Sequence, residues 1–128
     1  MIFGIGTDII EVERIQRFIA KGDSFKNRVF TPDEIAYCDS YRYSSQYYAV
    51  RFAAKEAFVK ALGTGFTNGI DFNQIEVAHD EQGKPFLNLS GKAKEIIEDK
   101  GITAIHVSLT HIKEWANAVV VLENSGSQ

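Results

Sequence analysis

Two acidic residues stand where simple packing would not place them. Asp8 interrupts the apolar opening of the chain, residues 2–10, and Glu56 lies inside a helical pattern over residues 51–62. Carboxylates from two separate segments can share one divalent cation, and magnesium prefers such oxygen ligands. Lys60 follows Glu56 by one helical turn and could neutralise phosphate oxygens beside that cation. Together these residues favour a magnesium-dependent enzyme that acts on a phosphorylated substrate.

Each of these residues also has a simpler interpretation. An Asp at the end of a buried strand commonly caps the helix that follows. Glu56 and Lys60 have the i,i+4 spacing of a helix ion pair, which is worth roughly 0.2–0.5 kcal/mol. The loop Gly63-Thr64-Gly65 allows close approach of a phosphate to the backbone, but Gly63 also suits a helix C-cap. The loop lacks a Walker pattern, which argues against a P-loop nucleotidase.

His111 ends a predicted strand, Val107-Ser108-Leu109-Thr110-His111. Beside a phosphate it could donate a hydrogen bond, although a lone histidine is more often a surface or core residue. His79 and His106 have no comparable setting, and the spacing of the three histidines gives little support to a zinc site.

The composition is that of one soluble globular domain. The 128 residues are 45% hydrophobic and 24% charged, unlike a disordered chain. The net charge of -3 argues against a dedicated nucleic-acid-binding protein. The hydrophobic runs are too short for a membrane span, and the N-terminal one lacks the basic flank of a signal peptide. Cys38 is the only cysteine, which excludes an internal disulfide and favours a cytoplasmic location.

Three basic residues recur at helical spacing near the N-terminus: Arg14, Arg17 and Lys21. Acidic residues dominate the rest of the chain. This basic strip is either the solvated face of a helix or a docking surface for an acidic partner.

The hydrophobic periodicity and turn residues predict an α+β domain over residues 1–123, followed by a polar tail over 124–128. Thr31 and Glu34 form a capping box at the start of a helix that ends near residue 40. The longest predicted helix covers 45–62, and another covers 12–21. The predicted strands cover 2–10, 70–78, 84–89, 102–109 and 115–122, with a short helix from 90 to 101.

Five motifs in order make the chain resemble the holo-acyl-carrier-protein synthases, the small bacterial type of 4'-phosphopantetheinyl transferase. The resemblance spans nearly the whole chain, although residues 41–48 match nothing diagnostic. The motifs are Gly4-Ile5-Gly6-Thr7-Asp8-Ile9-Ile10-Glu11, Phe30-Thr31-Pro32-Asp33-Glu34, the block from Arg51 to Gly65, Gly83-Lys84-Pro85, and Val107-Ser108-Leu109-Thr110-His111.

The resemblance implies the single-domain phosphopantetheinyl transferase fold, in which an antiparallel sheet packs against a long central helix. It implies transfer of the 4'-phosphopantetheine of coenzyme A to a serine of apo-acyl carrier protein, with release of adenosine 3',5'-bisphosphate, in fatty acid biosynthesis. It further implies a need for Mg2+, a homotrimer, and coenzyme A sites between neighbouring subunits. No nucleic acid or membrane partner is expected.

By matching motif, the resemblance also assigns roles to residues. Asp8 and Glu56 are expected to bind magnesium, with Lys60 near the pyrophosphate. The rest of the coenzyme A site is expected to comprise Arg51 at the 3'-phosphate, Gly63, Thr64, Gly65, Pro85 and His111. Arg14 and Arg17 match the basic first helix that docks the carrier protein.

Three questions stay open at this point. The base that deprotonates the carrier serine is either Glu56 or a water molecule at the metal. Contacts of residues 41–48 with the adenine are undecided. Two alternative functions also remain: a non-catalytic module that binds coenzyme A, which would not need paired carboxylates, and a metal-dependent phosphohydrolase, which would not need Arg14 and Arg17.

Overall fold

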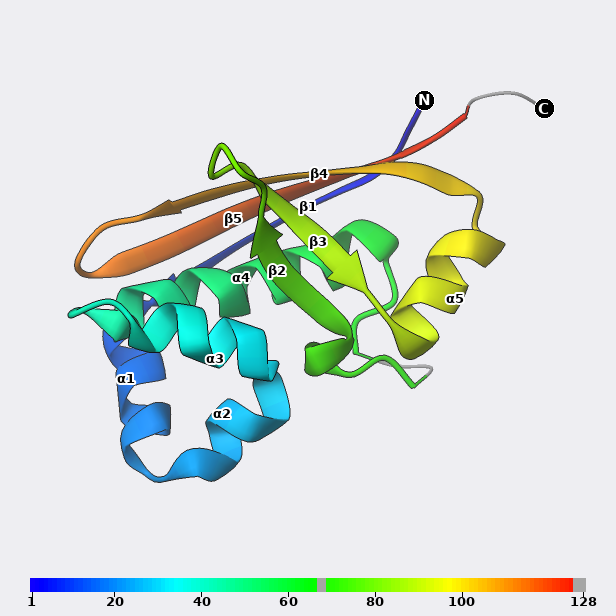
Figure 1. Cartoon of the computed structure of the whole chain (residues 1–128). Coiled ribbons are helices and arrows are strands. Elements are labelled where there is room, and N and C mark those ends of the chain that lie inside the picture. The colour runs from blue at the N-terminus through cyan, green and yellow to red at the C-terminus, as the bar shows by residue number, and fades with distance from the viewer. Residues whose placement is uncertain (67–68, 126–128) are drawn as a thin grey trace.

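The chain folds around one long helix, α4 (Ser44–Leu62). This helix lies against one face of a three-stranded antiparallel sheet, as Figure 1 shows. The strand order is β1-β5-β4, formed by β1 (Ile2–Glu11), β5 (Trp115–Asn124) and β4 (Ile102–His111). The computed structural model describes residues 1–66 and 69–125. Asn124 ends β5, and residues 126–128 of the predicted tail lie outside the described residues.

The remaining elements are arranged around the two ends of α4 (Figure 1). Three short helices gather beside its N-terminal half: α1 (Val12–Ala20), α2 (Asp23–Val29) and α3 (Pro32–Asp39). A second, two-stranded antiparallel sheet consists of β2 (Ile75–His79) and β3 (Pro85–Leu89). A short 3-10 helix, η1 (Phe72–Gln74), precedes β2, and α5 (Gly91–Asp99) follows β3.

Two glycines allow β1 to lie directly on α4. A methyl group at Gly4 would stand 2.0 Å from the carbonyl oxygen of Ala61, and one at Gly6 would stand 1.9 Å from that of Ala57. Any larger residue at either position would therefore force the strand and the helix apart. Side chains alternate along a strand, so Asp8 is the next residue of β1 on the face that meets α4.

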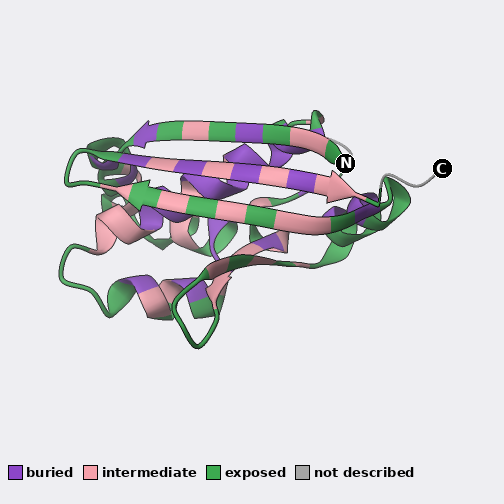
Figure 2. Cartoon of the chain, turned by 90° about the horizontal axis from the view of Figure 1, so that it is seen from above, coloured by how far each residue is buried: buried purple, intermediate pink, exposed green. Residues whose placement is uncertain are grey.

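The opposite face of the sheet carries no helix, as the view in Figure 2 shows. Exposed and more buried residues alternate along the strands (Figure 2), because successive side chains point to opposite faces of the sheet. Two large apolar side chains of β1, Ile5 and Ile9, are 61% and 62% exposed. In the described parts of the chain, no helix combines the length and the apolar character that crossing a membrane requires.

The predicted α+β class, long central helix and final hairpin are confirmed. The capping box is confirmed as well: Thr31 Oγ1 accepts from Glu34 N at 3.2 Å, and Glu34 Oε1 accepts from Thr31 N at 3.0 Å. Two local features were not predicted. One is the helix α2, whose sequence has no clear apolar period. The other is the capped 3-10 turn of residues 71–74, because of which β2 begins only at Ile75.

Candidate functional site

Asp8 lies within β1 and contacts Lys60 of α4. Lys60 Nζ donates to Asp8 Oδ1 at 2.9 Å and to the carbonyl oxygen of Thr7 at 3.0 Å. The strand continues to Glu11, and α1 begins only after that residue. The interpretation of Asp8 as a helix cap is therefore wrong, and its carboxylate is available for another role.

Glu56 is half-buried on α4 and senses the charge of Asp8. Burial raises the pKa of the Glu56 carboxyl, and the negative charge of Asp8 raises this pKa further. The positive charges of Lys60 and Arg14 act in the opposite direction. Two carboxylates and two cationic side chains thus meet where β1, α4 and α1 adjoin. We call Asp8, Glu56 and Lys60 the carboxylate cluster.

The carboxylate cluster fits a magnesium ion that is completed by other oxygens. Mg2+ is usually held by one or two carboxylates together with substrate phosphates and water, not by a cage of protein ligands alone. Within residues 1–66 and 69–125, no three His, Cys, Asp or Glu side chains are grouped as metal ligands. Asp8 and Glu56 therefore match an ion that shares its coordination with a substrate.

The glycine loop begins one turn after Lys60. Gly63 has the left-handed backbone of a C-cap, with φ of 81°, and its N–H donates to the carbonyl oxygens of Val59 and Lys60. The C-cap interpretation is therefore confirmed. Thr64 Oγ1 donates to the carbonyl oxygen of Gly65 at 3.0 Å. Thr64 also borders a hollow of about 550 Å3, together with Lys92 of α5 and Lys100, which follows α5.

The other residues assigned to coenzyme A lie around Arg51. The Arg51 guanidinium is buried, lies 4.2 Å from the Tyr37 ring centroid, and donates to the Tyr47 carbonyl oxygen at 3.2 Å. Its NH2 lies 3.5 Å from His79 Nδ1, and His79 pairs with Pro85 in the β2–β3 ladder. Within the described residues, the Nε of Arg51 is a buried polar atom without a hydrogen-bond partner.

His111 belongs to the same region. Its ring lies 5.0 Å from that of Tyr47, and His111 Nδ1 lies 3.0 Å from Gln46 Oε1. Burial lowers the pKa of His111, and the positive charge of Arg51 lowers it further; the same two causes lower the pKa of His79. We call Arg51, Pro85 and His111 the histidine cluster.

One chain does not bring the two clusters together. Arg51 and Glu56 are five residues apart on α4, so their side chains leave the helix at directions that differ by about 140°. Arg51 points toward α3 and β2, where it contacts Tyr37 and His79. Glu56 lies one helical turn before Lys60, which contacts Asp8 of β1, and the charge of Asp8 reaches Glu56. The predicted coenzyme A residues therefore occupy two sides of the same helix.

The basic residues of α1 lie at the surface beside the carboxylate cluster. Arg14 is positioned over the Phe18 ring, 6.0 Å from its centroid, and its charge reaches Glu56. Arg17 lies 3.8 Å from Glu13, but both side chains are more than two-thirds exposed, so this ion pair contributes little to stability. Arg14 and Arg17 thus both lie exposed at the surface of α1.

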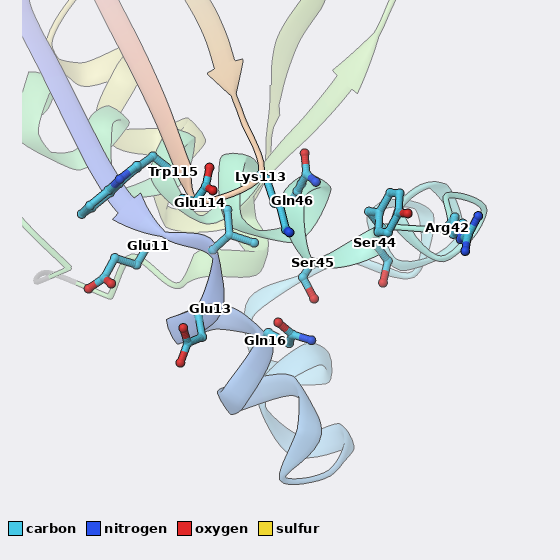
Figure 3. Close-up of a pocket in the computed structure, with 12 residues that line it drawn as sticks. Glu11, Glu13, Gln16, Arg42, Ser44, Ser45, Gln46, Lys113, Glu114 and Trp115 are labelled. Atoms are coloured by element: carbon cyan, nitrogen blue, oxygen red, sulfur yellow. The ribbon is translucent and has the colours of Figure 1, made fainter.

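A separate cavity of about 730 Å3 opens between the start of α1, the start of α4 and the turn between β4 and β5. Figure 3 shows Glu13 and Gln16 of α1 on one side of it, with Ser45 of α4 facing them. The lining carries charges of both signs: Arg42 and Lys113 are basic, and Glu11, Glu13 and Glu114 are acidic. No residue of the carboxylate cluster or the histidine cluster is among those that line it.

Three buried or half-buried polar residues near the clusters were not predicted as site residues. Asn117 Nδ2 donates to the carbonyl oxygen of Asp8 at 3.0 Å, which fixes the backbone of β1 at this point. Lys55 and Glu34 form a fully buried ion pair next to Glu56. The available signal for Lys55 was a charged residue among the alanines and phenylalanines of residues 52–58.

Comparison with solved structures defines the class of fold. The crystal structure of holo-[acyl-carrier-protein] synthase from Neisseria meningitidis matches with a TM-score of 0.90 and 38% identity, over 97% of this chain and 100% of that one. The holo-(acyl-carrier-protein) synthase of Bacillus anthracis, in complex with CoA (3',5'-ADP), matches with a TM-score of 0.81 and 40% identity, over 98% and 99% of the two chains. The fold is that of these synthases.

The sequence gives the same assignment. The pattern of the 4'-phosphopantetheinyl transferase superfamily matches residues 4–120. A holo-[acyl-carrier-protein] synthase of Syntrophus aciditrophicus is 48% identical over 124 residues, which are 96% of this chain and 97% of the relative. The chain belongs to the 4'-phosphopantetheinyl transferase superfamily, among the holo-[acyl-carrier-protein] synthases. The resemblance predicted from five motifs is thereby confirmed.

Proposed function

We propose that this chain performs the synthase reaction with a magnesium ion bound by Asp8 and Glu56. The enzyme transfers the 4'-phosphopantetheine moiety of coenzyme A to a serine of apo-acyl carrier protein and releases adenosine 3',5'-bisphosphate, a step of fatty acid biosynthesis. The observation that carries the proposed site is the meeting of Asp8, Glu56 and Lys60 across β1 and α4. A cytoplasmic location, predicted from the single cysteine, is part of the proposal.

The chemistry requires control of negative charge. The serine oxygen attacks the β-phosphorus of coenzyme A, and the bond from that phosphorus to the oxygen shared with the α-phosphate breaks. The bisphosphate leaves with this electron pair. Magnesium, when bound, would offset the charge of the pyrophosphate. Lys60 already lies within hydrogen-bond distance of Asp8, so its flexible side chain can reach a phosphate oxygen placed beside that carboxylate.

Glu56 is the protein group suited to accept the serine proton. A base works best when its pKa is near the operating pH. Burial and the Asp8 charge raise the pKa of the Glu56 carboxyl in the metal-free chain, which favours proton uptake there. A cation bound to Glu56 would lower this pKa, and a water molecule at the metal is then the alternative base. Asp8 is held by Lys60 and serves better as a fixed ligand.

We further propose that each coenzyme A site is shared by two subunits of a homotrimer. The carboxylate cluster and the histidine cluster lie on two sides of α4, so a neighbouring chain is needed to supply the second cluster to the first. The exposed Ile5 and Ile9 on the helix-free face of the sheet offer an apolar surface for such contact. A ring of three copies would repeat the same shared site at each interface.

The test is the intact mass of apo-acyl carrier protein after incubation with this protein, coenzyme A and magnesium, beside an EDTA control. We expect a mass gain of one phosphopantetheine that EDTA abolishes. A gain that persists with EDTA would refute the metal requirement. Coenzyme A binding without transfer to any carrier would instead favour a regulatory module, and release of free phosphopantetheine would favour a hydrolase.

A further inference from the structure

Lys55, the residue before Glu56, is fully buried and its charge is matched inside the protein. Lys55 Nζ lies 2.7 Å from Glu34 Oε1, and both side chains are 0% exposed. Lys55 Nζ also donates to the carbonyl oxygens of Val29 at 2.9 Å and Phe72 at 3.0 Å. The three donor positions of the ammonium group are therefore all used.

Glu34 carries the network into further segments. Its Oε1 accepts from the backbone N–H of Thr31, and its Oε2 accepts from that of Val77 at 2.8 Å. Lys55 and Glu34 thus connect α4 with the end of α2, the start of α3, the helix η1 and the strand β2. We call these two residues the buried clamp.

Stability alone does not explain a polar pair at this depth. Desolvation offsets most of the attraction in a buried ion pair, and apolar residues of similar volume often serve at least as well. Hydrogen bonds, unlike apolar contacts, are directional. Three of them on one ammonium group fix both the rotation of α4 and its position along its own axis.

The buried clamp holds α4 on the side away from β1. Successive helix residues point about 100° apart, so Lys55 can face α3 and β2 while Glu56 faces Asp8. On the β1 side, the backbone of Gly6 packs against the carbonyl of Ala57. The helix is therefore fixed from two sides at residues 55 and 57, and Glu56 lies between these two contacts.

We propose that Lys55 and Glu34 are positioning residues that hold Glu56 in the place relative to Asp8 that transfer requires. The catalytic part of this role rests on the proposed function, in which Asp8 and Glu56 bind the metal. The positioning itself, which is the arrangement of Glu56 relative to Asp8, can be measured without a metal. Neither Lys55 nor Glu34 needs to touch a substrate for this role.

The variant that tests the proposal is Glu34→Gln/Lys55→Met, which removes both charges together. Lys55→Met alone would leave a buried carboxylate without its partner and is expected to destabilise strongly. In the double variant the glutamine keeps an acceptor oxygen for the capping box, and methionine matches the length of lysine. Should the double variant not fold, Glu34→Asp, which keeps both charges of the pair and only shortens the carboxylate side chain, is measured in the same way.

The first readout is the crystal structure of the double variant beside that of the parent chain. We expect the Glu56 carboxylate to shift relative to Asp8, whereas an unchanged arrangement of the two would overturn the proposal. This comparison needs neither metal nor turnover. It therefore decides the positioning role even if the parent chain fails to modify a carrier protein, which would refute the proposed function instead.

The second readout is kinetic and separates positioning from simple loss of stability. We expect kcat of the double variant to fall by between about tenfold and a hundredfold, with the carrier KM unchanged and a higher Mg2+ requirement. Ile97→Ala is the matched control because Ile97 is buried on α5, away from both clusters. It should lower the Tm and leave kcat intact. Wild-type kcat in the folded double variant would overturn the proposal.

Discussion

Lys60 Nζ donates a 2.9 Å hydrogen bond to Asp8 Oδ1, so the predicted phosphate-binding lysine holds one of the two predicted metal ligands. The contact joins α4 to β1. Because the Lys60 side chain is 52% exposed, the ion pair adds at most about 1 kcal/mol to stability. Its consequence is electrostatic. The positive charge of Lys60 lies beside the carboxylates of Asp8 and Glu56. When a cation binds these carboxylates, the Lys60 side chain can turn toward a phosphate.

Lys60→Ala should therefore reduce catalysis much more than stability. We expect kcat to fall by about 10²–10³-fold, as for removal of a group that stabilises transition-state charge. The carrier KM and the Tm should change little. Steady-state kinetics and thermal unfolding check this, with Lys94→Ala on the exposed side of α5 as control. A raised carrier KM at normal kcat would assign Lys60 to docking.

At Glu56 we expect a trade-off between function and stability. Burial and the Asp8 charge raise its pKa, so the folded chain retains this proton to higher pH than the unfolded chain. The associated stability is present at low pH and is lost as pH rises through the folded pKa. Glu56→Gln should consequently raise the Tm of EDTA-treated protein at pH 7 by a few degrees, while abolishing transfer.

The control for that prediction is the same Tm comparison under acidic conditions, below the pKa of an unfolded glutamate. There Glu56 is protonated in both states, and the gain should disappear. Asp8→Asn should also abolish transfer, because it removes the negative charge of the other proposed metal ligand. Near-normal turnover in either variant would exclude that residue from the metal site.

Gly6→Ala should separate β1 from α4. The added methyl would stand 1.9 Å from the Ala57 carbonyl oxygen, a backbone atom that cannot turn away. We expect a loss of at least about 1–3 kcal/mol, as in other overpacked sites, and a drop in kcat because Asp8 moves with the strand. Gly101→Ala is the control: its φ of 69° is strained, but nothing lies within 4 Å. It should cost stability and leave kcat unchanged.

These contacts also show how far the sequence could lead. Local signals located most elements, because capping residues, glycines and apolar periods act within a few positions; Thr31 with Glu34 is the clearest case. The helix α2 was missed because its seven residues lack such a period. Asp8, Glu56 and Lys60 were recognised as candidates, and their meeting across two elements needed tertiary structure.

Long-range contacts could not be predicted from single positions. In the sequence, Lys55 is indistinguishable from an ordinary charged helix residue. Only the tertiary structure shows that it contacts Glu34 and the Phe72 carbonyl. The separation of Arg51 from Lys60 is likewise a property of the helix geometry combined with the position of β2. A motif states which residues occur together in sequence, and the fold decides which of them meet.

Arg14 supports a prediction about encounter with the carrier protein. Its guanidinium lies at the surface of α1, near enough to affect the pKa of Glu56. Arg14→Glu should raise the carrier KM several-fold and reduce its dependence on salt, since a rim charge mainly steers association. Lys94→Glu makes the same charge change on α5 and should have little effect. Equal salt dependence in wild type and Arg14→Glu would place docking elsewhere.

The division of the predicted site between two sides of α4 allows a test by mixing subunits. Asp8→Asn disables the carboxylate cluster and keeps His111, whereas His111→Ala disables the histidine cluster and keeps Asp8. If each site combines one cluster from each of two neighbouring chains, a mixed trimer contains interfaces in which both clusters are intact. Random mixing of equal amounts should restore transfer to about a quarter of the wild-type rate per subunit, because one interface in four receives both intact clusters.

The two variants are unfolded, mixed and refolded together, then assayed beside each variant refolded alone. Activity no higher than the average of the separate variants, in a preparation shown by light scattering to be trimeric, would mean that each site is built from a single chain.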